Sequence, residues 1–258
     1  MTATDALDIA VGAARAAAEI LIERFRGPAV GVRSKSTATD LVSEADERAE
    51  QAVVAYLHAR RPHDGLVAEE GSTSESRTGL RWLVDPLDGT INYLYGIPHW
   101  CVSVACADAD GAIAGAVLDP IRGELFTAAR GDGAQLGGRT IATSSVADPA
   151  AALVATGFSY DAGERGAQAA IIAKVAGSIR DIRRAGSAAL DLAWVAAGRI
   201  DAYFEVSRSA WDTAAGALLV REAGGEVTWT EHTEIVASGR PLHARLVSLL
   251  RASHEIGR

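Results

Sequence analysis

The sequence predicts an α/β fold, a layered αβαβα sandwich in which two mixed halves pack together. Three observations favour this fold: two amphipathic helical segments open the chain, short β-like runs follow, and strands then alternate with helices. Residues 1–146 are expected to form an N-terminal α+β half, and residues 147–258 a C-terminal α/β half. The length of 258 residues fits one large domain or two intimate halves.

Two helices are expected at the start of the N-terminal half. Apolar residues recur at three- and four-residue steps from Asp5 to Phe25, and Gly27-Pro28 ends the helix that they predict. The second helix is expected over Ser43–Arg60. Ser43 and Asp46 give it a start that resembles a capping box, with Asp in place of the usual Glu.

Short β-like runs fill the rest of this half. The predicted strands are Gly65–Ala68, Arg81–Val84, Trp100–Ala107, Ala112–Leu118 and Glu124–Ala129. Turns are expected at Asp110-Gly111 and at Gly131-Asp132-Gly133. Because proline has no backbone N–H, Pro86 is expected to stop the ladder of the second strand.

Strands and helices alternate in the C-terminal half. The predicted strands are Ala152–Thr156, Asp181–Arg183, Asp201–Val206 and Glu226–Trp229. The predicted helices are Ala167–Ser178, Ala188–Ala197, Thr213–Ala223 and Leu242–Arg251. Gly224-Gly225 is a suitable end for the third of these helices.

Composition excludes several classes of partner. The chain carries 33 acidic and 25 basic residues, a net charge of −8, which disfavours nucleic-acid or anionic-membrane partners. An anionic substrate stays possible, because a metal ion can invert the local field.

No signal peptide and no membrane-length apolar stretch is found, so a cytoplasmic protein is expected. The two cysteines, Cys101 and Cys106, lie in an apolar run and are predicted to be buried thiols.

The most informative stretch runs from Trp82 to Tyr93. An apolar strand ends in the carboxylate of Asp85, and a second carboxylate, Asp88, follows three residues later. Gly89-Thr90 then begins a predicted short helix, whose free N–H groups would bind phosphate. Two carboxylates beside an anion-binding turn favour Mg²⁺, which prefers oxygen ligands. The structural alternative is a strand followed by an ordinary Asp-Gly turn.

Three further acidic segments have simple structural explanations when each is taken alone. Glu69-Glu70-Gly71 ends a strand, and its acids could be solvated at the surface. The segment from Asp40 to Asp46 could place acids at a helix N-terminus. Asp212 could be the N-cap of the following Ala-rich helix. Their joint occurrence favours one shared site.

Together these segments resemble the inositol monophosphatase family of Mg²⁺-dependent, lithium-sensitive phosphatases. Its first signature is similar to Trp82 through Asn92, and its second to Trp211 through Gly225. The Glu-Glu strand end and the Asp40–Asp46 segment match in order and approximate spacing, so the resemblance covers nearly the whole chain. Departures are mild: Tyr93 stands where Phe is usual, and the C-terminal end is short.

The resemblance implies two or three Mg²⁺ ions in each active site. Their side-chain ligands would be Glu69, Asp85, Asp88 and Asp212, with the main-chain carbonyl of Leu87. The implied catalytic residues are Glu69 and the pair of Thr90 and Asp46, which would orient or deprotonate the attacking water. The phosphate would be held by the N–H groups of Gly89 and Thr90.

The resemblance also implies a substrate pocket in the C-terminal half. The residues expected to contact substrate are Gly186, Ser187, Ala188, Glu205 and Asp212. The alternatives are a helix N-cap for the Gly-Ser-Ala turn and an exposed strand-end carboxylate for Glu205. Lys35 matches a mobile-loop lysine near the metals, unless it is a solvated loop cation.

The expected activity is Mg²⁺-dependent hydrolysis of a small polyol or sugar phosphate, first of all myo-inositol 1-phosphate, by a metal-activated water. Histidinol phosphate, fructose 1,6-bisphosphate and 3′-phosphoadenosine phosphate are the alternative substrates. A haloacid dehalogenase mechanism is disfavoured because Pro86 stands where its nucleophilic Asp belongs. The non-enzyme alternative is a catalytically silent binding or scaffold protein. Family similarity further implies a homodimer.

Overall fold

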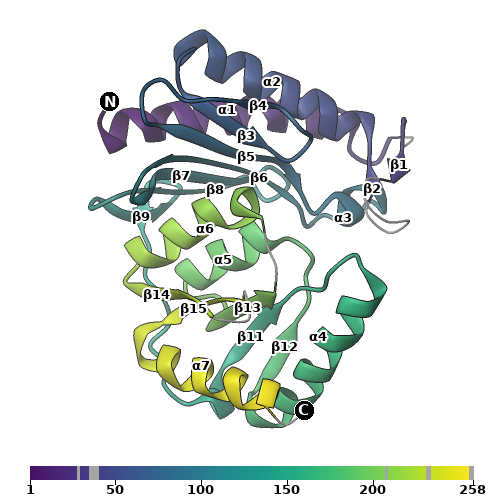
Figure 1. The fold of residues 1–258 in the computed structure, drawn as a ribbon, viewed down its shortest axis with the longest axis vertical. Helices are drawn as coiled ribbons and strands as arrows, with labels where there is room; N and C mark the ends of the chain where they lie inside the picture. The colour runs from purple at the N-terminus through teal and green to yellow at the C-terminus, as the bar shows by residue number, and fades with distance from the viewer. Residues whose placement is uncertain (28–29, 35–40, 207–208, 231–233, 256–258) are drawn as a thin grey trace.

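The chain folds into five layers in the order α/β/α/β/α, which confirms the predicted fold class (Figure 1). This computed structural model describes residues 1–27, 30–34, 41–206, 209–230 and 234–255. Two N-terminal helices cover the outer face of an eight-stranded sheet. Two central helices lie between that sheet and a five-stranded sheet, whose outer face is covered by two more helices. Within the described residues, no helix is long and apolar enough to cross a membrane.

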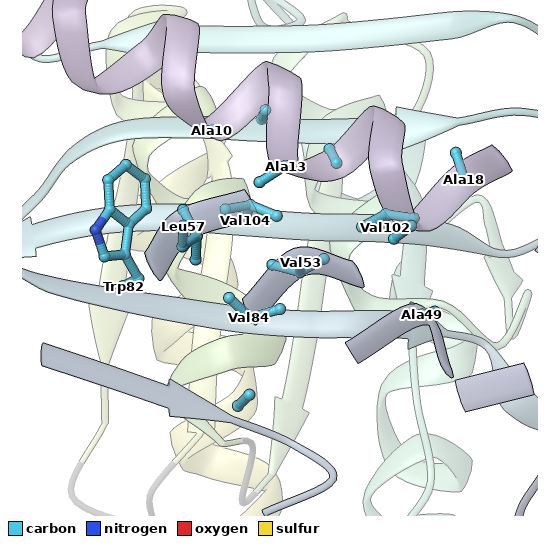
Figure 2. Packing of buried hydrophobic residues seen from close by; sticks show 14 of the residues in the cluster. Ala10, Ala13, Ala18, Ala49, Val53, Leu57, Trp82, Val84, Val102 and Val104 are labelled. Atoms are coloured by element: carbon cyan, nitrogen blue, oxygen red, sulfur yellow. The ribbon is translucent and has the colours of Figure 1, made fainter. Parts of the chain in front are cut away.

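The outer layer of the N-terminal half consists of α1 (Ala3–Arg24) and α2 (Glu44–Arg60), as predicted. The predicted capping box of α2 is confirmed: the Ser43 hydroxyl accepts from the Ala45 N–H at 3.2 Å, and Asp46 Oδ2 accepts from the Ser43 N–H at 2.9 Å. The face that α1 buries is almost entirely alanine. Figure 2 shows these alanines beside Val102 and Val104 of the sheet, where small side chains allow close packing.

The eight-stranded sheet has the order β10-β9-β8-β7-β6-β5-β3-β4. Its strands are β3 (Gly65–Ala68), β4 (Thr73–Ser74), β5 (Arg81–Asp88), β6 (Cys101–Asp108), β7 (Gly111–Asp119), β8 (Glu124–Ala129), β9 (Gly133–Leu136) and β10 (Arg139–Thr140). A separate pair of two-residue strands consists of β1 (Arg33–Ser34) and β2 (Leu41–Val42). The five predicted strands are present, and both cysteines are buried thiols in β6.

The prediction that Pro86 stops its strand is wrong. β5 continues to Asp88, and its pairing with β6 shifts register between Asp85 and Asp88. A bulge accommodates the missing N–H of proline and keeps the chain in the sheet. The short strands β4, β9 and β10 were not predicted, since runs of two to four residues give no periodicity to detect.

The second sheet has the order β12-β11-β13-β15-β14. Its strands are β11 (Leu153–Thr156), β12 (Asp181–Arg183), β13 (Ala202–Val206), β14 (Gly225–Trp229) and β15 (Glu234–Gly239). Around it lie α4 (Ala162–Val175), α5 (Ala188–Ala196), α6 (Ala210–Glu222) and α7 (Arg240–Glu255), with 3₁₀ turns at Pro149–Ala151 and Ala176–Ser178. β15 was missed because its strand character comes from pairing between β13 and β14.

The predicted start of α4 at Ala167 is also wrong. The helix begins five residues earlier, where the Asp161 carboxylate accepts from the N–H groups of Gly163 and Glu164, both at 2.9 Å. Its first five residues, Ala162–Gly166, include two glycines and form no apolar face, so hydrophobic periodicity could not mark this start.

Close packing brings α6 against the first sheet. A Cβ added at Gly115 of β7 would lie 2.9 Å from the Ala215 Cα of α6. The glycine therefore lets the helix approach the sheet closely, and this carries the first turn of α6 to the carboxyl end of β5.

Candidate active site

Two acidic side chains meet at one edge of the first sheet because β3 and β5 are parallel neighbours. Ala68 pairs with Val84, so the residues that come next, Glu69 just past the end of β3 and Asp85 within β5, lie side by side. The Glu69 N–H donates to the Val84 carbonyl at 3.1 Å and extends the pairing by one step. Glu69 is partly buried and is therefore not merely a solvated surface acid.

A third acid, Asp212, comes from the C-terminal half. It lies in the first turn of α6, where its Oδ2 accepts from the Ser209 N–H at 3.0 Å. Ser209 is the N-cap and Asp212 is the third helical residue, so the alternative that Asp212 is the N-cap is wrong in position, although its carboxylate completes the capping box. Carboxylate oxygens of Glu69, Asp85 and Asp212 all lie within 4.8 Å of one another.

This acidic cluster, defined as Glu69, Asp85 and Asp212, carries buried charges of one sign. Asp85 is only 1% exposed. Burial raises the pKa of Asp85 well above its usual value, and the neighbouring charges of Glu69, Asp88 and Asp212 raise it further. Three converging carboxylates with only oxygen donors fit a hard divalent cation such as Mg²⁺.

Mg²⁺ is therefore expected to stabilise the fold. At a concentration about 100 times its Kd, the ion should raise Tm by about 5–10 °C. The Asp85→Asn variant should lose this rise, because the substitution removes a ligand charge. The local structure should persist, since the asparagine side-chain oxygen can still accept from the Leu87 N–H (3.0 Å in the wild type). Differential scanning calorimetry with Mg²⁺, and with NaCl at equal ionic strength, measures both effects.

The sign of the pH effect follows from the raised pKa of Asp85. The native metal-free protein keeps a proton that the unfolded chain releases near pH 4, so its stability falls as pH rises above about 4. Asp85→Asn should remove this loss and make the metal-free protein more stable at neutral pH. A variant that keeps the full Mg²⁺-induced rise would show that Asp85 is not a ligand.

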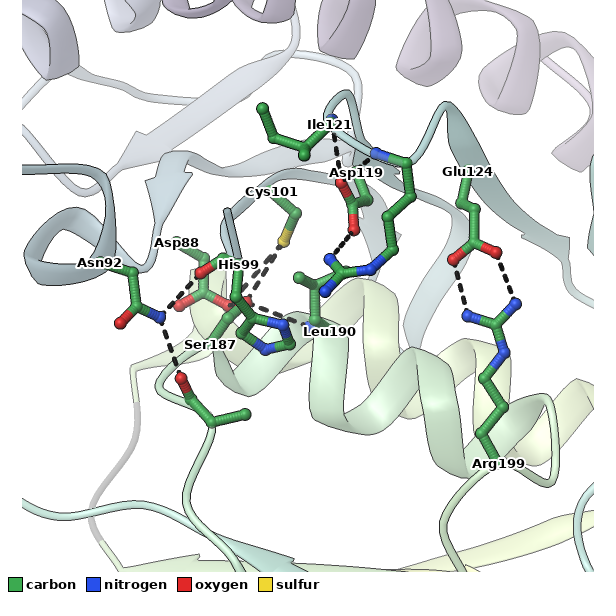
Figure 3. Close-up of polar contacts among 12 residues, drawn as sticks. Asp88, Asn92, His99, Cys101, Asp119, Ile121, Glu124, Ser187, Leu190 and Arg199 are labelled. Atoms are coloured by element: carbon green, nitrogen blue, oxygen red, sulfur yellow. Dashed lines mark hydrogen bonds and ion pairs between the residues drawn. The ribbon is translucent and has the colours of Figure 1, made fainter. Parts of the chain in front are cut away.

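Asp88 does not belong to the acidic cluster, although its charge raises the pKa of Asp85. Its Oδ2 accepts from the Ser187 hydroxyl at 2.7 Å (Figure 3). The same oxygen accepts from the Ala189 N–H at 2.6 Å. The Cys101 thiol lies 3.9 Å from the same oxygen. Asp88 therefore joins the end of β5 to the start of α5 across the two halves.

The predicted pair of Thr90 and Asp46 is in contact. Thr90 Oγ1 lies 3.0 Å from Asp46 Oδ1 and 3.1 Å from the Leu87 carbonyl. Asp46 is fully buried, and Ser43 donates to its other oxygen through both its N–H and its hydroxyl. The helix-terminus alternative is thus also confirmed, since one carboxylate caps α2 and holds the Thr90 hydroxyl.

The predicted short helix after Asp88 is α3 (Thr90–Leu94), and Gly89 is its N-cap with φ of 99°. Only glycine adopts this backbone conformation readily. Because Thr90 opens the helix, its N–H has no partner within α3. The turn therefore offers a backbone donor beside the carboxyl end of β5.

Four of the five predicted substrate residues line a narrow polar pocket, and the fifth, Asp212, lies in the acidic cluster instead. The pocket lining includes Gly186, Ser187, Ala188 and Glu205, together with Asp88. Ser187 is also the N-cap of α5, as the structural alternative supposed. Glu205 is 3% exposed and accepts from the Tyr203 hydroxyl, so the alternative of an exposed strand-end carboxylate is wrong.

Several further residues of this pocket were not predicted from the sequence. Asp191, Tyr160 and Arg184 line the same pocket. Asp191 is 2% exposed, and burial followed by the charges of Asp88 and Glu205 raises its pKa well above the usual value. Its place one turn after Ser187 on α5 was the sequence signal that could have assigned it to the pocket.

Lys35 and Asp40 lie outside the described residues.

Comparison with known proteins decides the family. The model of the inositol monophosphatase family matches residues 3–255. The chain belongs to this family. Inositol monophosphatase from Anabaena has 34% sequence identity and a TM-score of 0.85, with 95% of each chain covered.

Other relatives of this inositol monophosphatase family member carry a different name. The Nus factor SuhB of Xylella fastidiosa is 43% identical over 223 residues, which cover 86% of this chain and 81% of the relative. The Escherichia coli protein of the same name is 40% identical over 224 residues, or 86% and 84% of the two chains. Membership of the family is thus shown, and its members carry more than one functional name.

Proposed function

We propose that this protein is a Mg²⁺-dependent phosphatase that hydrolyses small polyol phosphate monoesters. One observation carries the proposal: Asp88, whose charge acts on Asp85 of the acidic cluster, directly precedes the Gly89-Thr90 turn and lines a polar pocket together with Glu205 and Ser187. Glu69, Asp85 and Asp212 would hold the metal, with Asp88 and the Leu87 carbonyl as further ligands. Bound Mg²⁺ would neutralise phosphate charge and lower the pKa of a coordinated water.

Thr90 and Asp46 would handle the proton of the attacking water. A hydroxyl that donates to Asp46 leaves its own oxygen lone pairs free to accept a hydrogen bond from water. Thr90 can thus take a proton while its own moves to Asp46, which the Ser43 bonds hold in place. The N–H groups of Gly89 and Thr90 would hold the phosphate.

The pocket favours a polyhydroxylated leaving group. Carboxylates at Asp191 and Glu205 accept hydrogen bonds from hydroxyl groups, and Arg184 at the same pocket donates them. Myo-inositol 1-phosphate is the first candidate on this basis. Histidinol phosphate, fructose 1,6-bisphosphate and 3′-phosphoadenosine phosphate are the alternatives to compare in one panel with Mg²⁺. Absence of phosphate release from every member of the panel would reject the proposal.

Glu205→Gln should act on polyol recognition alone. The amide keeps the shape of the side chain but removes the charge that strengthens a hydrogen bond from a ring hydroxyl. We expect KM for myo-inositol 1-phosphate to rise about tenfold, while KM for p-nitrophenyl phosphate changes little. Steady-state kinetics with both substrates measures the difference.

Gly157→Ala tests the same role of Glu205 by a steric change. A methyl group at Gly157 would overlap the Glu205 carboxylate and displace it without changing its charge. The same selective rise in KM is expected. Equal effects of either substitution on both substrates would argue against contact between Glu205 and the ring.

A second candidate function is that of a binding or scaffold protein without turnover. It is favoured by the relatives named Nus factor SuhB, a name that mentions no phosphatase activity. Metal-dependent binding of a phosphate monoester without phosphate release would support this candidate against the enzyme. A homodimer and a cytoplasmic location remain predictions.

A further inference from the structure

We infer that Asn92 is a positioning residue that holds the substrate loop, residues 184–188 of the C-terminal half, against the phosphate-binding turn of the N-terminal half. The inference rests on the proposed function only where it concerns substrate. Asn92 Nδ2 donates to the His99 carbonyl at 2.7 Å and to the Ala185 carbonyl at 2.9 Å (Figure 3). One amide thus joins α3, the segment before β6 and the substrate loop.

The orientation of the Asn92 amide follows from its partners. Both partners are carbonyl oxygens, which only accept, so the amide nitrogen must face them. Each of its two hydrogens then has a bond, and the side chain is 8% exposed. Asn92 is also the single asparagine among the 258 residues.

Two glycines allow α3, the segment before β6 and the substrate loop to pack closely around Asn92. A Cβ at Gly186, where φ is +99°, would lie 3.0 Å from Asn92 Nδ2. A Cβ at Gly89, also with φ of +99°, would lie 3.0 Å from the His99 carbonyl oxygen. Since the first glycine belongs to the substrate loop and the second to the phosphate-binding turn, the Asn92 contacts fix the separation of these two parts.

The substrate loop is thereby attached at two points. Its α5 end is bound by Asp88, which accepts from Ser187 and Ala189, and its other end by Asn92 through the Ala185 carbonyl. The phosphate-binding turn has backbone support of its own, because the Tyr93 N–H donates to the Gly89 carbonyl at 3.0 Å. Loss of the Asn92 amide should therefore displace the polyol pocket more than the phosphate site.

Asn92→Ala and Asn92→Asp test the inference. Alanine removes both donors, and aspartate places oxygen atoms against two carbonyls. With Mg²⁺, KM for myo-inositol 1-phosphate should rise about 10- to 30-fold, while kcat/KM for p-nitrophenyl phosphate should stay within about threefold. The control is Ser238→Ala, which removes a buried bond to His243 (3.0 Å) outside the pocket and should change neither substrate selectively.

Hydrogen exchange gives a readout that does not depend on turnover. The amides of residues 184–190 should exchange faster in Asn92→Ala than in wild type or in Ser238→Ala. Unchanged exchange there, equal losses on both substrates or no kinetic change would each overturn the inference. If wild-type protein hydrolysed neither substrate, the proposed function would fail, and exchange alone would decide whether Asn92 positions the loop.

Discussion

Asp88→Asn is expected to lower kcat by about 10³-fold or more while the fold stays intact. The side-chain oxygen of asparagine can still accept from the Ser187 hydroxyl and the Ala189 N–H, so the link to α5 survives. The NH₂ group then replaces the other carboxylate oxygen, and it cannot act as a metal ligand. The measurement is turnover of myo-inositol 1-phosphate at saturating Mg²⁺, with Tm as the test of the fold.

Asp108→Asn is the matched control. It makes the same chemical change at the opposite end of β6, in an ion pair with Arg130 at 2.9 Å that is partly exposed. Its kcat should equal that of wild type. Near-wild-type kcat in Asp88→Asn would refute the assignment of Asp88 as a ligand, and a large fall in Tm would attribute the loss to folding instead.

Parts of the candidate site that depend on local sequence could be predicted. Glu69 directly follows β3 and Asp85 lies in the neighbouring parallel strand β5, so their meeting needs only the order of neighbouring strands. Thr90 and Asp46 were paired only through the family resemblance, although the capping box of α2 was visible in the sequence.

Contacts between the two halves could not be predicted from local patterns. Asp88 and Ser187 are 99 residues apart, and nothing near Asp88 shows that its carboxylate accepts from the start of α5. The bulge at Pro86 could not be predicted from local sequence either, because it is the pairing with β6 that keeps β5 in the sheet past the proline. The prediction failed there because tertiary pairing outweighed a local rule.

Net charge could not locate the site either, because it is a property of the whole chain. The acidic excess of 8 argued against polyanionic partners, yet it could not locate three carboxylates within 4.8 Å of one another. That cluster is assembled from β3, β5 and α6. With a divalent cation bound, the proposed site would attract phosphate despite the negative charge of the chain.

Thr90→Val should lower kcat by about 10²- to 10⁴-fold, the usual range for loss of acid–base assistance. Valine has nearly the shape of threonine and suits this buried position, but it cannot accept a proton or donate one to Asp46. The four proposed carboxylate ligands are unchanged, and the Leu87 carbonyl loses only its bond from Thr90, so the Mg²⁺ concentration for half-maximal activity should change little. Kinetics over a Mg²⁺ series separates the two quantities.

The control for Thr90→Val must separate proton handling from the capping role of Asp46. Ser43→Ala removes the N-cap hydroxyl of α2 and should lower Tm by about 2–4 °C. The backbone N–H of residue 43 still donates to Asp46 Oδ2, so Asp46 keeps its orientation toward Thr90 and most of kcat should persist. If Thr90→Val lost no more kcat than Ser43→Ala, the Thr90 hydroxyl would have only a structural role. A large loss confined to Thr90→Val would instead require that its hydroxyl takes part in proton transfer, since both substitutions remove a bond to the same carboxylate.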